Sequence, residues 1–120
     1  SAAAFNWEKI ILLKECANPF HPKAVRASSG LSARMTLFSG PSIHELNNTK
    51  DLIALDLEGE NLYHSQLKSP IRLLVGEEGP GIPKNLNIKK IHIPMSDKVE
   101  SLNATVAASI VMSYLSRNKI

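Results

Sequence analysis

The sequence predicts an α/β domain with a mostly parallel sheet flanked by helices. Short uninterrupted apolar runs, typical of strands buried on both faces, alternate along the chain with helical patterns. With 120 residues and 43% hydrophobic content, the chain can form one compact core and is too short for two. We therefore expect a single domain over residues 1–120.

Five apolar runs are predicted as strands. The first, Ile10 to Leu13, is rich in β-branched residues and is typical of a buried parallel strand. The remaining strands are expected at 34–38, 52–55, 72–75 and 90–93, with 62–63 as a short extension after the third.

The first helical segments are short. Residues 2–7 are predicted to be the end of a helix. Pro22 suits the first position of a helix over 23–29, which Gly30 ends. Ser42 and Glu45 then have the spacing of a capping box, which predicts a helix from 43 to about 47.

The last segment carries the clearest helical pattern. Leu102, Val106, Ile110 and Tyr114 recur every four residues, and small alanines widen the apolar face. We expect this face to pack on the sheet, and a subunit contact is an additional use that the pattern allows.

Composition limits the functional classes only loosely. Fourteen Lys and Arg against eleven Asp and Glu give a net charge of +3, compatible with a polyanionic partner. The basic residues are scattered, however, which favours ordinary solvated surface charge. The sequence has no apolar run long enough for a membrane helix and no basic region at its start, so we expect a cytoplasmic protein.

Cysteine and histidine usage points away from disulfides and metals. Cys16 is the single cysteine, and we expect it to pack as a small buried residue near a strand end, in a reducing compartment. The histidines are isolated along the chain and show no zinc-ligand spacing. They are His21, His44, His64 and His92.

The most informative loop is Gly76-Glu77-Glu78-Gly79-Pro80-Gly81-Ile82-Pro83. It follows a predicted buried strand, at the end where open α/β sheets place their ligands, and its glycines allow close approach of a ligand to backbone. A phosphate-binding loop is disfavoured, because the pattern matches no such motif and two carboxylates would repel phosphate. Taken alone, the loop fits a structural turn as well as a site.

Three linked segments give the loop a more specific meaning. In order and spacing, VGEEGPGIP, IPM and ESLNATVAASI resemble the second and third motifs of SpoU-class RNA ribose 2'-O-methyltransferases, members of the SPOUT superfamily. SAAAFNWEKIILL and NPFHPKAVRASSG extend the resemblance over almost the whole chain. The resemblance implies a sheet with a C-terminal trefoil knot.

The family's first motif, Asn-x-Gly-x-x-x-Arg, and the strand before it precede the segment that resembles residues 1–5. We therefore expect that strand and motif to lie outside these 120 residues. The family assigns activation of the ribose hydroxyl to that arginine, and neither Arg26 nor Arg34 lies in the motif. We accordingly expect the chain itself to transfer methyl groups to RNA poorly.

The resemblance also implies site residues. S-adenosylmethionine would lie in a cleft formed by the knot, and the segment from Leu55 to Gly59 would line it. The implied cofactor-binding residues are Leu55, Gly76, Gly79, Gly81, Ile93, Met95 and Leu102. Glu78, Ser101 and Asn103 match the polar motif residues expected near the chemistry. Without the family, the favoured interpretations are a helix cap for Ser101 and an exposed loop acid for Glu78.

The implied activity is S-adenosylmethionine-dependent methylation of a ribose 2'-hydroxyl in rRNA or tRNA, without a metal. The implied partners are the RNA substrate and a second copy of the chain in a homodimer. The alternative is a non-catalytic module with the same knotted fold that binds S-adenosylmethionine or RNA.

Overall fold

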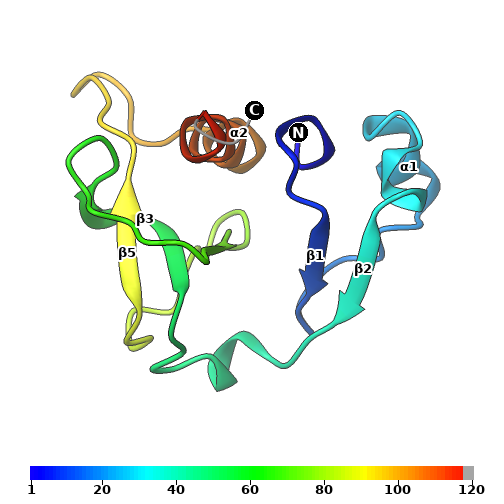
Figure 1. The fold of residues 1–120 in the computed structure, drawn as a ribbon, viewed down its shortest axis with the longest axis horizontal. Helices are drawn as coiled ribbons and strands as arrows, with labels where there is room; N and C mark the ends of the chain where they lie inside the picture. Colours follow the sequence, from blue (N-terminus) through cyan, green and yellow to red (C-terminus); the bar gives the residue numbers. More distant parts are fainter. Residues whose placement is uncertain (118–120) are drawn as a thin grey trace.

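The computed structural model describes residues 1–117, and its strands form two parallel sheets. The strands are β1 (Lys9–Leu12), β2 (Thr36–Ser39), β3 (Leu52–Asn61), β4 (Arg72–Leu74) and β5 (Lys89–His92). One sheet pairs β1 with β2, and the other has the order β4-β3-β5, with every pairing parallel (Figure 1). The parallel α/β architecture is confirmed, and the expectation of one continuous sheet is wrong.

Two α-helices and three short 3-10 helices complete the described residues. They are α1 (Pro22–Ala27), α2 (Ala104–Ser116), η1 (Ala3–Phe5), η2 (Leu31–Ala33) and η3 (Ile43–Glu45). The prediction of a helix over 23–29 was too long, because Ser29 and Gly30 adopt left-handed φ values of 52° and 77°. The segments predicted at 2–7 and 43–47 form only the single turns η1 and η3.

Strand β3 organises the core. Its side chains alternate, so that Leu52 and Ala54 enter one apolar cluster and Ile53 enters another. Helix α2 covers the second face of this sheet, where Ala107 and Val111 pack with Ile53 (Figure 1). The first face is covered by residues of η3 and of the segment between β4 and β5, including Ile43, Ile82 and Leu86. Burial on both faces explains why the third strand has a continuous apolar sequence.

Helix α2 packs on the sheet with most of the predicted apolar face. Leu102 precedes the helix, whose N-cap is Asn103, and Val106 is 48% exposed. The buried apolar positions are Ala107, Ala108 and Val111. Leu102, Ile110 and Tyr114 of the predicted stripe pack against the same apolar cluster, so the packing face is confirmed except at Val106.

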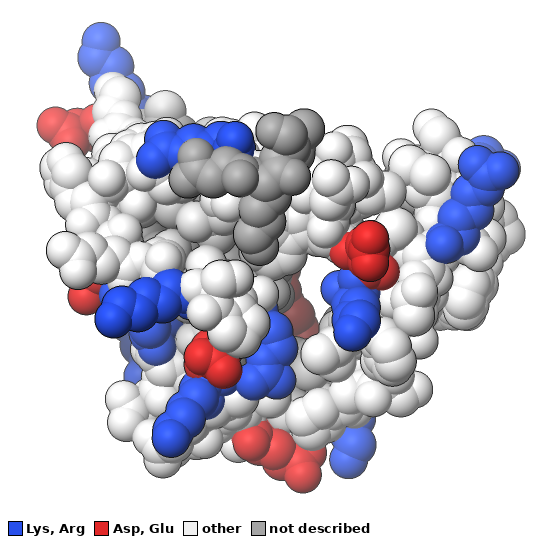
Figure 2. All heavy atoms as spheres, viewed as in Figure 1, with Lys and Arg blue, Asp and Glu red and all other residues white. Residues whose placement is uncertain are grey.

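The sheet of β1 and β2 adds little to the core. None of residues 1–42 is buried, and a cavity of about 870 Å³, lined partly by Ile10 and Leu74, separates β1 from β4. Figure 2 shows a hollow between the two parts of the molecule. Trp7 nevertheless ties β1 to α2, because its Nε1 donates to Ser116 Oγ at 2.9 Å while that hydroxyl donates to the Phe5 carbonyl oxygen at 2.9 Å.

The structure also differs from the predictions at Cys16 and at the ends of two strands. Cys16 is exposed, which corrects the expectation that it packs in the interior; it lies in a turn past β1 in which its N–H donates to the Leu13 carbonyl. The strand predicted at 34–38 begins at Thr36, because Arg34 closes η2. The strand predicted at 52–55 continues to Asn61, with Leu62 buried beyond it.

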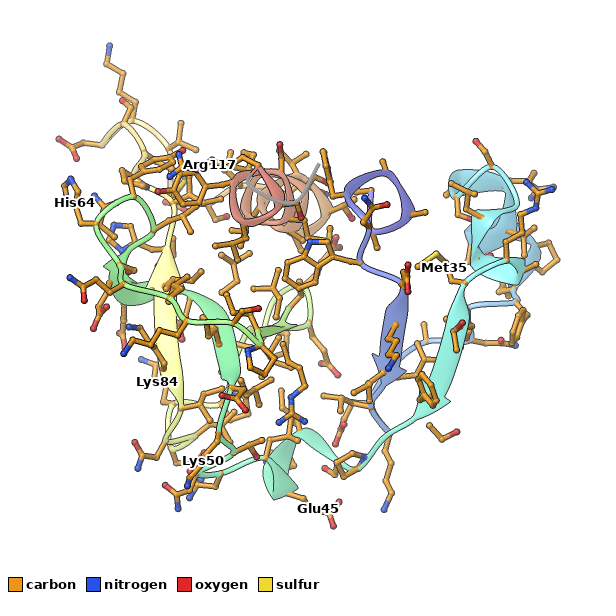
Figure 3. The ribbon with its side chains drawn as sticks, in the orientation of Figure 1. Met35, Glu45, Lys50, His64, Lys84 and Arg117 are labelled. Carbon is orange, nitrogen blue, oxygen red and sulfur yellow. The ribbon has the colours of Figure 1, made fainter. Side chains whose placement is uncertain are left out.

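Charged side chains are dispersed over the surface. Figure 2 shows Lys and Arg in small groups separated by other residues on the viewed face. Some are paired with acids, as Lys14 is with Glu45 and Lys89 with Glu60. In Figure 3, Glu45 and Lys50 lie near the end of the molecule where the chain passes from β2 to β3. This distribution agrees with the interpretation of solvated surface charge.

Glu15 links the turn after β1 to η3. The predicted capping box of Ser42 and Glu45 is confirmed, and the Ser42 hydroxyl also donates to the Glu15 carboxylate. The Ile43 N–H donates to the same carboxylate at 3.1 Å. These hydrogen bonds, that from Ser42 first, lower the pKa of Glu15 below its ordinary value.

We predict that Glu15→Gln makes unfolding less dependent on pH. Because the pKa of folded Glu15 is lowered, its contribution to stability is present above the unfolded carboxyl pKa, near about 4.3, and is lost as pH falls through the folded value. The variant should be slightly less stable at pH 7 and lose less stability between neutral and acidic pH. Urea titrations across pH, with exposed Glu100→Gln as control, measure this; identical pH profiles for wild type and Glu15→Gln would contradict it.

Candidate functional site

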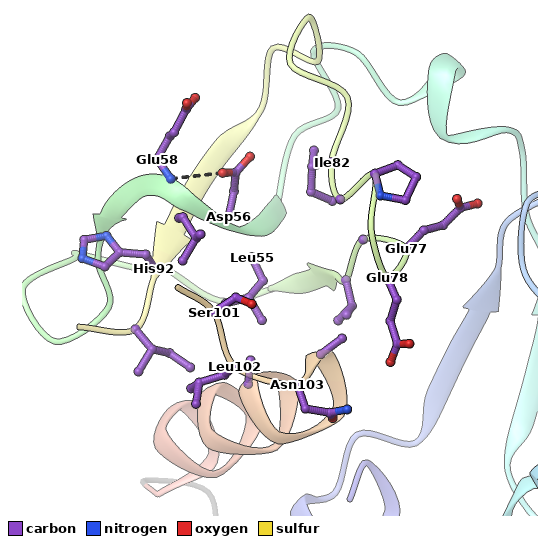
Figure 4. A pocket seen from close by; sticks show the side chains of 18 of the residues that line it. Leu55, Asp56, Glu58, Glu77, Glu78, Ile82, His92, Ser101, Leu102 and Asn103 are labelled. Atoms are coloured by element: carbon purple, nitrogen blue, oxygen red, sulfur yellow. Dashed lines mark hydrogen bonds between the residues drawn. The ribbon is translucent and has the colours of Figure 1, made fainter. Parts of the chain in front are cut away.

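A cavity of about 600 Å³ lies where the ends of the central strands meet the start of α2. Four segments line it: residues 55–58 of β3, the loop that follows β4, residues 92–95 at the end of β5, and residues 101–104 before and at the start of α2. Figure 4 shows Glu77 and Glu78 on one side, with Asp56 and His92 on the other. Parallel strands bring these distant segments together because their carboxyl ends meet at one edge of the sheet.

Every site residue predicted from the sequence lines this cavity. They are Leu55, Gly76, Glu78, Gly79, Gly81, Ile93, Met95, Ser101, Leu102 and Asn103. The structure therefore brings the three linked sequence segments into one place. The individual binding and catalytic roles of these residues remain predictions.

The glycine loop after β4 is closed by contacts that leave little room for side chains. The Gly81 N–H donates to the Glu77 carbonyl at 3.0 Å, so the loop folds back on itself. A Cβ on Gly76 would lie 2.7 Å from the Gly81 carbonyl carbon, closer than real contacts allow. Gly79 and Gly81 have φ values of 91° and 67°, which favour glycine. The glycines thus place backbone at the cavity beside the side chains of Glu77, Glu78 and Ile82.

Asn103 holds the start of α2. Its Oδ1 accepts the N–H groups of Thr105 at 2.9 Å and Val106 at 3.2 Å, so Asn103 is the N-cap. Ser101 lies two positions earlier, and the alternative that Ser101 caps the helix is wrong. Glu78 is exposed on the glycine loop, as the alternative of a loop acid described. Because Glu78 is exposed and lines the cavity, a ligand in the cavity can reach its carboxylate.

The opposite wall is formed where β3 leaves and rejoins β5. Leu55 and Glu60 both pair with Ile91, so residues 56–59 form an excursion between them. Asp56 and Lys90 are joined by an ion pair of 3.2 Å, with side chains only 18% and 17% exposed. Leu57 and Glu58 line the cavity from this excursion, which agrees with the expected role of the segment from Leu55 to Gly59 as a wall.

The cavity lining is more acidic than basic. Asp56 is balanced by Lys90, which leaves Glu58, Glu77 and Glu78 against Lys84. Such a lining attracts cationic ligands and disfavours phosphate, in agreement with the rejection of a phosphate loop. The apolar part of the wall comes mainly from Leu55, Ile82, Ile93, Met95 and Leu102. The cavity can therefore hold a flat apolar group together with positive charge.

Some lining residues were not predicted individually. Ile82 lies in the glycine segment, but only its glycines and Glu78 were selected. Ala107 lies one helical turn after Asn103, a spacing that could have indicated it. Lys84 and His92 had no signal beyond their closeness to the motifs. Arg26 and Arg34 are not among the residues that line the cavity.

Two further findings concern residues 1–117 as a whole. No helix in this range is both long and apolar enough to cross a membrane. Nor does this range contain a group of three or more His, Cys, Asp or Glu side chains arranged to hold a metal ion.

Comparisons with known proteins agree on one family. The model of the SpoU rRNA Methylase family matches residues 1–113. A protein of Syntrophobacter fumaroxidans, named ribosomal RNA small subunit methyltransferase G 2, is 44% identical over 118 residues, a match that covers 98% of this chain and 24% of that protein. The chain spans less than half the length of the curated relatives it matches first.

Solved structures give the same result for the fold. The AdoMet-bound rRNA methyltransferase from Sinorhizobium meliloti has a TM-score of 0.83 at 24% identity, covering 99% of this chain and 49% of that one. The SpoU methyltransferase AviRb from Streptomyces viridochromogenes, in complex with the cofactor AdoMet, has a TM-score of 0.78 at 25% identity, covering 98% and 52%.

We predict that Gly76→Ala destabilises the protein by about 1–3 kcal/mol, the usual effect of inserting a methyl group into a packed site. Its Cβ would meet the backbone of Gly81, which cannot move without opening the loop. Asn85→Ala, at an exposed position in the segment that follows the loop, is the control and should have little effect. Urea unfolding measures both variants, and equal stability of Gly76→Ala and wild type would show that the loop is not closed as described.

Proposed function

Because this chain belongs to the SpoU rRNA methylase family, we propose that it forms the cofactor-binding part of an enzyme that methylates a ribose 2'-hydroxyl of RNA with S-adenosylmethionine. The observation that carries the proposal is the shared cavity of the glycine loop, the Ile93-Pro94-Met95 segment and the Ser101-Leu102-Asn103 turn. The S-adenosylmethionine complex of AviRb supports the choice of cofactor. The RNA would be ribosomal or transfer RNA, and the proposed location is the cytoplasm.

The cavity has the size and lining that this cofactor needs. Its volume of about 600 Å³ lies within the roughly 300–1,000 Å³ usual for small-molecule sites. Ile93, Met95 and Leu102 provide apolar walls for an adenine ring, and the glycine loop offers backbone N–H and carbonyl groups at the ring edge. The acidic residues of the lining suit the sulfonium and ammonium charges of the cofactor.

The chemistry requires alignment more than activation of the methyl group. S-adenosylmethionine supplies a methyl group on a sulfonium, which an oxygen nucleophile attacks in line. The protein must hold the ribose hydroxyl opposite that bond and help remove its proton. Glu78 can accept a hydrogen bond from the hydroxyl, while Ser101 and the amide of Asn103 can orient the ribose or close the loop. Asn103 Oδ1 already caps α2, so its amide nitrogen is the group left for this role.

The proposal extends to the C-terminal trefoil knot that the family implies, which would involve the segments that line the cavity. The alternative function is a non-catalytic module that binds S-adenosylmethionine or RNA.

Alkaline hydrolysis of the RNA after reaction tests for methylation of the ribose. A methylated 2'-oxygen cannot attack the neighbouring phosphodiester, so each methylated site leaves an alkali-resistant dinucleotide. This chain alone should methylate RNA poorly, and a chain extended upstream through an Asn-x-Gly-x-x-x-Arg segment should be active. Cofactor binding by both chains without methyl transfer to any RNA by either would favour the alternative.

We predict that the chain binds S-adenosylmethionine or its demethylated product one to one in titration calorimetry. Gly79→Val should weaken binding, because a branched residue at a φ of 91° forces the loop to rearrange. Gly30→Val places the same strain at a φ of 77°, outside the cavity, and should leave affinity unchanged. Absence of binding heat at millimolar ligand would reject the cofactor site. Unchanged affinity of Gly79→Val would show that the loop does not contact the ligand.

We also predict a homodimer, which the family implies and the exposed apolar residues of α2, such as Val106, support. Light scattering at tens of micromolar protein should give about twice the mass of one chain. Val106→Glu should shift the molecules toward monomer, whereas Thr105→Glu, an exposed position about 100° around the same helix, is the control for added charge. A monomeric wild type at this concentration would contradict the prediction.

A further inference from the structure

Lys90 lies outside the cavity, yet its side chain contacts the wall. Its Nζ is 3.2 Å from Asp56 Oδ2, and both side chains are largely buried. The other carboxylate oxygen, Asp56 Oδ1, accepts the Glu58 N–H at 3.0 Å (Figure 4). Asp56 therefore connects a cation on β5 to the backbone of the cavity wall.

The excursion of residues 56–59 is held at its other end as well. A Cβ on Gly59 would lie 2.4 Å from the Ile91 nitrogen, so the backbone of Gly59 rests directly on β5. The Gly59 carbonyl oxygen is 2.7 Å from His92 Nδ1. Because a carbonyl can only accept, Nδ1 carries the proton in this contact. Two residues of β5 on either side of Ile91 thus hold the ends of the wall, Lys90 at the start and His92 at the end.

The held segment has few other contacts to keep its shape. Leu57 is 58% exposed and Glu58 is also exposed, so apolar packing cannot fix the excursion. A partly buried ion pair has the strength to do so, since removal of one partner leaves the other charge without compensation. The adjacent pair of Lys89 and Glu60 has the same 3.2 Å separation, but its side chains are 38% and 63% exposed, and exposed pairs contribute little.

From this arrangement we propose that Lys90 is a positioning residue for the cofactor cavity. It holds Asp56, and Asp56 holds the backbone of residues 56–58 at the distance from the glycine loop that the ligand requires. Lys90 does not contact the ligand itself. This inference rests on the proposed S-adenosylmethionine site and adds to it a residue that belongs to none of the motifs.

The experiment compares Lys90→Met, Lys90→Arg and Lys89→Met by calorimetry with S-adenosylmethionine. Lys90→Met should weaken affinity by about five- to tenfold, within the range of coupling energies for residues of one network. Lys90→Arg keeps the charge and should restore most of the affinity. Lys89→Met breaks the exposed pair on the neighbouring residue and should change affinity by less than about twofold. Equal affinities of Lys90→Met and wild type would overturn the proposal.

A second measurement does not depend on the cofactor. Hydrogen exchange at the Glu58 amide, followed by NMR in ligand-free protein, should be faster in Lys90→Met than in wild type or Lys89→Met, with amides of α2 unchanged. If wild type fails to bind S-adenosylmethionine, the proposed function fails, and this measurement still decides whether Lys90 holds the wall. An unchanged exchange rate of the Glu58 amide in Lys90→Met would overturn the inference that Lys90 holds the wall.

Asp56→Asn breaks the same ion pair from the other side. The amide oxygen can still accept the Glu58 N–H, but the charge is removed. If Lys90→Met does not fold, Asp56→Asn by itself should weaken affinity by about five- to tenfold, and unchanged affinity would overturn the proposal. Where Lys90→Met folds, the two substitutions can also be combined. Lys90→Met added to Asp56→Asn should then cost clearly less affinity than Lys90→Met alone, because the pair is already broken. Fully additive effects of the two substitutions would contradict a role that acts through Asp56.

Discussion

The rest of the structure depends on the burial of strand β3 along both edges and on both faces. It pairs in parallel with β4 and β5, and its alternating side chains supply both apolar clusters. Since its neighbours run in the same direction, the segments that follow the strands emerge at one edge of the sheet. Helix α2 then covers one face and brings its N-terminus to that edge. The cavity is a consequence of this packing, because no single segment could form it.

Glycines decide how closely the walls of the cavity approach other backbone. Gly59 allows β3 to return to β5 after its excursion, and Gly76 allows the loop after β4 to close on Gly81. In both places a methyl group would collide with main-chain atoms, so the restriction is steric rather than a matter of φ. Residues with positive φ, such as Gly79, turn the loop without touching other residues.

Burial is distributed unequally along the chain. The buried residues all follow position 42, while β1, β2 and α1 lie on a part that is attached through Trp7 and Ser116 and through the contact of Glu15 with η3. Only a few polar contacts and partly buried side chains hold this part. The candidate site is therefore built on the well-packed sheet and not on this loosely attached part.

The amino-acid sequence alone was sufficient for the type and order of the main elements, because apolar runs, capping residues and glycine-proline signals act within a few residues. The linked motifs also indicated every site residue chosen in advance except Leu55, which came from the wider resemblance. Tertiary packing decided the rest. It exposed Cys16 and Val106, divided the strands between two sheets, and joined Asp56 to Lys90 across the strand pair. Such contacts depend on which distant segments become neighbours, and the periodicity of one segment carries no information about its partner.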